Sequence, residues 1–293
     1  MKKIISLALA LVMLVGALGM FASCGKNKNL VALDAVDLLV EDFGIAVKKG
    51  NTKLLTEVNK VIDQWVSDGT MAKYIDYYTA YEKYVSGTGE KPNANGLTTS
   101  WNFGNATETI TVYTESGFAP FEFVADGQVV GVDIAIMSQV AVNMGKKIVV
   151  NDGDFNAIPL NVQKSTGDAV GAAGLTINDE RKEMVDFSNI YYSSTLVIVS
   201  AEKKSYTKVS DLEGLKVGVQ EGTSGDLIIS DAAGNGYTYE DGDGNKKTVT
   251  AKKAEVKRYK QYALALADLQ AGRIDAILMD KLPAQLMLAN IEE

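Results

Sequence analysis

The most informative absence in this sequence is that of histidine. The 293 residues contain no histidine and a single cysteine, Cys24. Histidine is the commonest general base and the commonest metal ligand in proteins, so an enzyme or a metal site is less expected here. One cysteine excludes a disulfide bond within the chain. We therefore expect a protein that is not an enzyme and that needs neither a metal nor a cofactor.

The chain also lacks an excess of basic residues and, beyond its first 23 residues, a long apolar run. Its formal net charge is -8, with 46% hydrophobic and 23% charged residues. Nucleic acids and anionic membrane surfaces attract basic proteins, so no nucleic-acid partner is expected. No segment after residue 23 reaches the ~18 apolar residues that a membrane-spanning helix needs. The composition predicts a globular chain of one large domain or two smaller ones.

The N-terminus has the layout of an export signal. Two lysines precede an apolar stretch over residues 4–21, and two small residues stand directly before Cys24. This order is typical of secretory signals that are cleaved after small residues. The ending resembles a bacterial lipobox, in which the cysteine becomes the lipidated N-terminus, although Phe21 departs from the usual aliphatic residue. We expect a lipoprotein signal peptide over residues 1–23, an anchor linker over residues 24–29 and an extracytoplasmic protein anchored to the cell membrane; an uncleaved anchor is the alternative.

Two amphipathic helices are predicted before residue 86. Apolar residues recur at three- and four-residue steps from Leu54 to Trp65, and a second set runs from Met71 to Tyr81. Residues 86–107 are rich in Gly, Asn and Thr, which predicts a surface linker. From Thr109 onward strands alternate with helices, which predicts right-handed βαβ units and a mostly parallel sheet. The expected strands are 109–113, 147–151, 169–173, 195–200, 215–220, 255–259 and 274–279. The expected helices are 131–144, 156–165, 224–232, 260–271 and 281–291.

Residues 231–254 interrupt this alternation. Two short strand-like runs flank the turn sequence Asp-Gly-Asp-Gly-Asn at residues 241–245, which predicts a β-hairpin. The same residues offer oxygen ligands for calcium. However, Lys246 and Lys252 stand where a calcium loop of the helix–loop–helix kind needs a glycine and a bidentate glutamate. A hairpin is therefore the expected structure.

Three motifs carry a resemblance to a known family. They are residues 115–123 (Glu-Ser-Gly-Phe-Ala-Pro-Phe-Glu-Phe), residues 131–134 (Gly-Val-Asp-Ile) and residues 173–181 (Ala-Gly-Leu-Thr-Ile-Asn-Asp-Glu-Arg), the last being the most specific. Together they resemble the polar amino acid-binding proteins of ABC importers, which form family 3 of the extracellular solute-binding proteins. The resemblance implies an α/β protein with a two-lobe periplasmic-binding-protein-like fold, built of mostly parallel sheets and crossing hinge strands.

The order of the motifs is unusual for that family. The stretch from Phe43 to Thr70 looks like the end of such proteins, yet here it precedes their normal beginning. The resemblance therefore implies a circularly permuted order, with the linker bridging the original termini, which usually lie close together on the surface. We expect lobe 1 over residues 40–198, including an 85–107 bridging linker, and lobe 2 from residues 30–37 plus 200–293. The crossing strands are expected near residues 37–43 and 195–202.

The resemblance also implies the residues of an amino acid site. Arg181 would hold the α-carboxylate through its planar fork, and Asp280, at the carboxyl end of a strand, would hold the α-ammonium. Further hydrogen bonds would come from Thr176 and from the backbone of Ala173 and Gly174, and Gln220 would occupy a further pocket position in the second lobe. The remaining implied residues are Thr223 and Ser224 at a helix start, Phe118 and Phe155 around the ligand side chain, and Glu115 at its distal end.

Each of these residues also has a plain structural interpretation. Without the motif, Arg181 would be a solvated charge at a helix start, and Asp280 and Thr223 would be helix caps. Phe118 and Phe155 would be core aromatics. These alternatives stay open at the level of sequence.

The function implied by the resemblance is ligand capture for an ABC-type uptake system. We expect a monomeric, lipid-anchored substrate-binding protein that delivers a polar amino acid to ABC permease subunits. An acidic Glu115 favours basic amino acids, with glutamine second. The alternatives are an enzyme of the same fold, such as a dehydratase, or a ligand-binding sensor subunit, because a fold does not fix a function.

The lipid anchor leads to the first prediction. Replacing Cys24 by serine removes the only thiol of the chain, so the Cys24→Ser variant should leave the membrane fraction or remain unprocessed. Fractionation and electrophoretic mobility of the two proteins measure this. A variant that fractionates and migrates like the wild type would show that Cys24 is not the attachment point.

Overall fold

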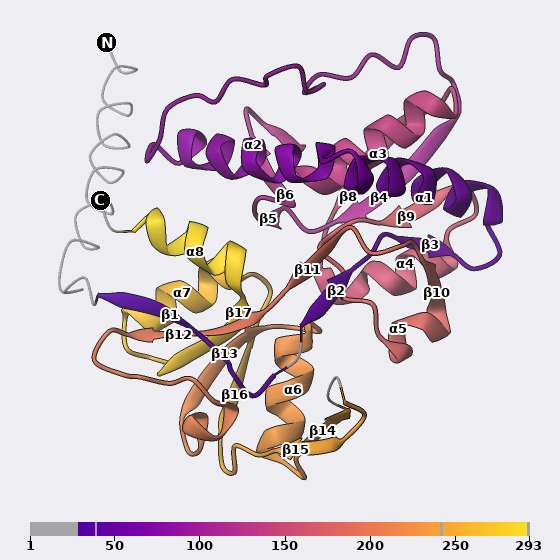
Figure 1. Ribbon diagram of the computed structural model, residues 1–293. Coiled ribbons are helices and arrows are strands. Elements are labelled where there is room, and N and C mark those ends of the chain that lie inside the picture. The colour runs from indigo at the N-terminus through magenta and orange to yellow at the C-terminus, as the bar shows by residue number, and fades with distance from the viewer. Residues whose placement is uncertain (1–28, 39, 241–242, 292–293) are drawn as a thin grey trace, which may run out of the picture.

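The computed structural model describes residues 29–38, 40–240 and 243–291. The expected signal peptide, Cys24 and the Asp-Gly dipeptide at residues 241–242 lie outside the described residues. The described elements form two groups, each built on its own five-stranded sheet, with two strands running between the groups (Figure 1). Within the described ranges, no helix combines the length and apolarity required to cross a membrane.

The described residues up to Val85 contribute to both groups. This N-terminal segment comprises β1 (Leu30–Asp34), β2 (Glu41–Phe43), β3 (Ala46–Lys48), α1 (Thr52–Ser67) and α2 (Thr70–Val85). Asn51 caps α1 by accepting a hydrogen bond from the Leu54 amide at 3.2 Å. Helix α1 buries the apolar stripe that its sequence predicts, and it packs against α3.

The first sheet has the strand order β10-β3-β9-β4-β8. Its strands are β4 (Thr109–Thr114), β8 (Lys147–Asp152), β9 (Ala169–Gly171), β10 (Val185–Phe187) and β3. The helices of this group are α3 (Val132–Asn143), η1 (Phe155–Ala157), α4 (Ile158–Lys164) and α5 (Asp179–Met184), and a small sheet contains β5 (Gly117–Phe118), β6 (Glu122–Ala125) and β7 (Gln128–Val130). Strand β3, from the N-terminal segment, thus lies inside a sheet whose other members follow Thr109.

The second sheet has the strand order β1-β12-β17-β13-β16. Its strands are β12 (Leu196–Ala201), β13 (Lys216–Gln220), β16 (Glu255–Tyr259), β17 (Ala276–Asp280) and β1 at the edge. The helices are η2 (Val209–Leu212), α6 (Ser224–Ala233), α7 (Tyr262–Gln270) and α8 (Lys281–Ala289). The predicted strands and helices after Thr109 are all present, with ends shifted by a few residues.

A two-stranded ribbon joins the two groups. β2 pairs antiparallel with β11 (Tyr192–Ser194), and the chain passes from β11 directly into β12. β12 belongs to the second sheet from its first residue, so the expected lobe boundary at residue 198 falls inside this strand. Two chain crossings in one ribbon are what a hinge between lobes requires.

The sheets are mixed rather than mostly parallel. In each sheet two pairings are parallel and two are antiparallel. The antiparallel pairings involve β1 and β3 of the N-terminal segment and the strands that flank the crossing, β10 and β12. A strand that enters a sheet from the crossing ribbon runs against the βαβ units, so the prediction of mostly parallel sheets was wrong on this point.

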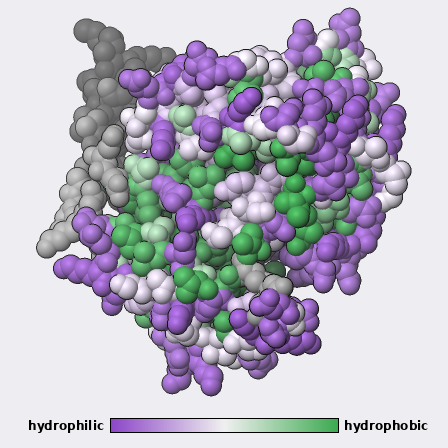
Figure 2. All heavy atoms as spheres, in the orientation of Figure 1, coloured by the Kyte–Doolittle hydropathy of each residue, from purple (hydrophilic) through white to green (hydrophobic). Residues whose placement is uncertain are grey.

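The two irregular segments behave as predicted. β14 (Tyr237–Glu240) and β15 (Lys246–Val249) form an antiparallel hairpin beside α6. Residues 86–107 contain turns but neither helix nor strand in the structure. Figure 2 shows hydrophilic residues over most of the outer surface in this view, with hydrophobic residues gathered toward the middle of the face.

A core substitution in α1 tests whether the N-terminal segment is part of the fold. Leu54 is completely buried, so the Leu54→Ala variant should lower the free energy of unfolding by about 2–5 kcal/mol. Val66, on the same helix, is half exposed, and Val66→Ala should change it by less than about 0.5 kcal/mol. Denaturant unfolding measures both. Equal, small effects would mean that α1 is not integral to the core.

Candidate ligand-binding site

The residues implied by the motifs meet between the two sheets. Glu115 follows β4, Gln220 ends β13 and Asp280 ends β17, while the loop that contains Thr176 follows β9. Carboxyl ends of parallel strands form one edge of a sheet, which is where ligands bind in open α/β sheets. These edges of the two sheets lie opposite each other, and hydrogen bonds connect side chains of one group to the other group there.

Glu115 lies in a buried contact between the two groups. Its Oε2 accepts a hydrogen bond of 2.8 Å from Gln220 Nε2, and its Oε1 accepts one of 2.6 Å from Gln261 Nε2. Burial raises the pKa of Glu115, and the two amide donors partly oppose that effect. Glu115 is only 3% exposed and pairs with no lysine in the part of the chain that the structure describes, so its carboxylate is directed at amides of the second group.

Phe118 and Gly174 are in close contact beside Glu115. Gly174 has φ +55°, and a Cβ atom placed there would lie 2.6 Å from the Phe118 ring. Only glycine tolerates both that backbone conformation and that ring. Phe118 also stacks on Tyr262, from the start of α7, at 6.4 Å between ring centroids. An aromatic pair thus spans the two groups at this point.

Arg181 is buried in α5 rather than solvated. Its guanidinium donates hydrogen bonds to the Thr176 carbonyl at 2.7 Å and to the Gly222 carbonyl, in the other group, at 3.0 Å. The guanidinium carbon lies 5.3 Å from the centroid of the Phe155 ring, within range of a cation–π contact. Burial lowers the pKa of Arg181 to about 10, against the attraction of nearby carboxylates. The interpretation of Arg181 as a surface charge is therefore wrong.

Thr223 and Ser224 form the start of α6. Thr223 is the N-cap: its Oγ1 accepts a hydrogen bond from the Asp226 amide at 3.3 Å and donates one to the Gln220 carbonyl at 2.8 Å. The capping interpretation of Thr223 is thus confirmed. The positive end of the helix dipole faces the region between the groups, which favours an anion there.

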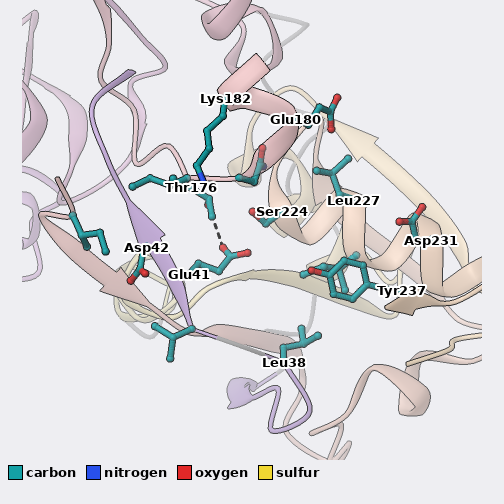
Figure 3. A pocket seen from close by; sticks show the side chains of 15 residues that line it. Leu38, Glu41, Asp42, Thr176, Glu180, Lys182, Ser224, Leu227, Asp231 and Tyr237 are labelled. Atoms are coloured by element: carbon teal, nitrogen blue, oxygen red, sulfur yellow. Dashed lines mark hydrogen bonds between the residues drawn. The ribbon is translucent and has the colours of Figure 1, made fainter. Parts of the chain in front are cut away.

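Asp280 and Glu41 bring two buried carboxylates to the same place. Asp280 stands at the N-cap position of α8 but makes no capping hydrogen bond with its side chain. Its Oδ1 is buried without a hydrogen-bond partner among the described residues. Glu41, on the crossing strand β2, accepts a hydrogen bond of 3.4 Å from the Thr176 hydroxyl, and Figure 3 shows its carboxylate between Thr176 and Ser224. Burial raises the pKa of both carboxyl groups.

A cavity of about 550 Å³ opens beside Glu41, while Asp280 and Arg181 are not among the residues that line it. It lies between α5, α6, β2 and the hairpin, and Glu41, Thr176 and Ser224 line it (Figure 3). Tyr237 of β14 and Lys182 of α5 stand farther along its wall. The carboxylate of Glu41 therefore borders a space large enough for water or a small ligand.

Sequence reasoning missed three residues of this region: Glu41, Gln261 and Tyr262. Gln261 and Tyr262 follow the carboxyl end of β16, so the rule that located Asp280 could have found them. Glu41 lies two residues before Phe43, where the stretch that resembles the end of such proteins begins, but nothing local indicates that Glu41 is buried. Its burial depends on how the crossing strand passes between the two groups.

A second pair of acids lies behind the Gly174 loop. Glu122 and Asp133 are fully buried, and Asp133 Oδ2 accepts a hydrogen bond of 3.0 Å from the Gly174 amide. Neither Glu122 oxygen meets a donor among the described residues. Burial raises the pKa of Asp133 to about 7. Burial also raises the pKa of Glu122, and the negative charge of Asp133 adds to that effect. One proton held between the two carboxyl groups would supply the missing donor.

This pair predicts a pH effect on stability. An acid whose pKa is raised by folding binds more protons in the folded state than in the unfolded state. Its contribution to the free energy of unfolding is therefore fully present below the unfolded pKa and is lost as the pH rises toward the folded pKa. Glutamine cannot ionise. When the pH rises from about 5 to about 8, the free energy of unfolding of the Glu122→Gln variant should therefore fall by about 1–2 kcal/mol less than that of the wild type. Thermal unfolding at both pH values measures this, with the exposed Glu90→Gln as control. Parallel pH profiles would contradict it.

Comparisons with known proteins agree with this architecture. Residues 110–280 match the bacterial extracellular solute-binding proteins, family 3. The arginine-binding extracellular protein ArtP of Bacillus subtilis is 36% identical over 110 residues, which cover 38% of this chain and 43% of ArtP. A probable histidine-binding protein of Campylobacter jejuni is 29% identical over 194 residues, which make up 66% of this chain and 68% of that protein. The chain thus spans less than half of the first of these relatives.

The solved structures give the same result. An ancestral arginine-binding protein bound to arginine has a TM-score of 0.53 and 31% identity, with 63% of this chain and 75% of that chain covered. A structure of an ancestral arginine-binding protein bound to glutamine also has a TM-score of 0.53 and 31% identity. The two-lobe α/β fold expected from the motifs is confirmed. With two lobes, a buried site between them and a family match over most of its length, the chain belongs to family 3 of the bacterial extracellular solute-binding proteins.

Proposed function

We propose that this protein is the substrate-binding subunit of an ABC-type amino acid uptake system, held outside the cell membrane by a lipid on Cys24. The observation that carries the proposal is the buried arrangement of Arg181 opposite Asp280, with donors and acceptors from both lobes around them. A zwitterion offers a carboxylate to the first and an ammonium to the second. An unpaired charge is costly to bury, so a site of this kind suits a ligand that carries both charges.

The ligand carboxylate would lie between Arg181 and the start of α6. The two Arg181 hydrogen bonds now go to backbone carbonyls, which a carboxylate can replace as the stronger, charge-assisted acceptor. Helix α6 begins at Ser224, which lines the cavity, so the positive end of its dipole favours an anion there. The ammonium would be held by Asp280, whose Oδ1 has no other hydrogen-bond partner in the described part of the chain.

The ligand side chain would extend along Phe118 and Phe155 to Glu115. Phe155 already lies against the Arg181 guanidinium, so its face accepts a cationic group. Glu115 is buried and accepts hydrogen bonds from the side-chain amides of Gln220 and Gln261, and it forms no ion pair with a lysine or arginine among the described residues. We therefore rank basic amino acids first and glutamine second; the names of the matched relatives, which cite arginine and histidine, support the basic class.

We further propose that the chain is a circular permutant within its family. The family match begins at residue 110, while residues 30–48 supply β1 to one sheet and β3 to the other. On this basis lobe 1 comprises about 40–195 and lobe 2 comprises residues 30–37 with 196–293, each boundary to within a few residues. The 85–107 segment would then bridge the former termini, because it joins α2 to β4 without regular structure.

Calorimetry against the common amino acids tests the proposal. We expect tight binding of arginine, lysine or ornithine, with glutamine weaker. The Arg181→Ala variant lacks the guanidinium that would pair with the ligand carboxylate, so that carboxylate would be buried without a partner. The dissociation constant should therefore rise by about two to four decades. Arg273→Ala, which removes an exposed arginine paired with Asp268, should bind like the wild type.

Two results would contradict this assignment. An Arg181→Ala variant that binds within threefold of the wild type would exclude Arg181 as the carboxylate partner. Tight binding of glutamate, with no response to arginine, lysine or glutamine, would overturn the role of Glu115.

A further inference from the structure

Glu41 is a buried acid for which the proposed site has no role. It comes from β2, the strand that crosses between the lobes, while Asp280 ends β17 in lobe 2 and Arg181 lies in α5 of lobe 1. All three side chains are less than a tenth exposed. Two carboxylates and one guanidinium leave an excess of one negative charge on buried side chains, which is costly unless a cation or a proton joins them.

The hydrogen bonds around Glu41 indicate which part of the ligand it serves. The Thr176 hydroxyl donates its single proton to Glu41 Oε2 at 3.4 Å, so its lone pairs remain to accept. Asp280 Oδ1 is a second free acceptor within the described chain. An ammonium group carries three donors and no acceptor, so a site of several acceptors with an excess negative charge suits the ammonium end of the ligand.

We propose that Glu41 is a second acidic residue of the ammonium site: before the ligand binds, Glu41 and Asp280 hold one proton between them, and the ligand ammonium replaces that proton. This inference rests on the proposed amino acid-binding function. The released proton goes to solvent through the cavity that Glu41 lines. In the complex the ammonium contacts both carboxylates, while Arg181 pairs with the carboxylate of the ligand, and contact with the ammonium lowers the proton affinity of the acid pair.

The surroundings of Glu41 favour this exchange. Burial is the main cause that raises its pKa, and the Asp280 carboxylate adds to it, while hydrogen bonding to Ser224 and the charge of Arg181 act against it. Tyr237 from β14 and Tyr262 from α7 also face Glu41, and Tyr192 from β11 faces Asp280. The phenol groups of all three have a raised pKa, so they stay neutral near pH 7 and leave the two acids as the groups that titrate.

Proton-linked calorimetry tests the exchange. L-Arginine is titrated into the protein in buffers of different ionisation enthalpy at several pH values between about pH 5 and pH 8. We expect proton release on binding, and a dissociation constant that rises as the pH falls, approaching about tenfold per pH unit where one full proton is exchanged. The Glu41→Gln variant should lose this pH dependence. Asp42→Asn is the matched control, because Asp42 is the next residue on β2 and accepts a hydrogen bond from Ser193 at 2.6 Å instead.

The outcomes separate this inference from the proposed function. Glu115 is the other acid with a raised pKa in the site, so Glu115→Gln is titrated in parallel and should keep the proton release. Wild-type binding of arginine without proton release or pH dependence would overturn the role of Glu41 and leave the proposed function intact, whether or not the variants fold. Equal release from wild type and Glu41→Gln would do the same. Failure of the wild type to bind any amino acid would overturn both.

Discussion

The structure depends on keeping a few charges out of water between two lobes. Arg181, Asp280 and Glu41 are all buried, and each comes from a different part of the fold. Burying an ion costs several kcal/mol unless partners and hydrogen bonds compensate. In this chain the compensation crosses the cleft: Arg181 donates to the Gly222 carbonyl of the other lobe. The hydrogen bond that joins the lobes therefore also compensates the buried charge of Arg181.

The framework around these charges is rigid where they need to be positioned. Arg181 follows Asn178, whose side chain caps α5 through the Arg181 amide at 2.8 Å, so the helix start fixes the direction of the arginine. The Gly174 loop is held from behind by Asp133 and from the front by Phe118. The ribbon of β2 and β11 connects the lobes and carries Glu41. A change in the lobe angle would therefore move Glu41 relative to Arg181 and Asp280.

The N-terminal segment shows how one stretch of chain can complete two domains. Its strands enter both sheets, and its helices α1 and α2 cover the first lobe. Such a segment can be placed at either end of the chain, because a sheet requires only that each strand is present and correctly paired, whatever its position in the sequence. The antiparallel pairings at β1 and β3 follow from the direction in which the crossing ribbon delivers these strands.

The sequence alone determined the local elements and most of the residues of the candidate site. Apolar periodicity located α1 and α2, the alternation of strands and helices located the elements after Thr109, and the motif ending in Arg181 indicated the family, because these signals depend on neighbouring residues only. Only the tertiary structure decided the mixed strand directions and the contacts of Glu41 and Gln261. These residues lie 239 and 19 positions from Asp280 along the chain by their numbers in the sequence, and no local pattern reports a pairing across a cleft. Burial, which raises the pKa of Glu41, is a property of the packed lobes.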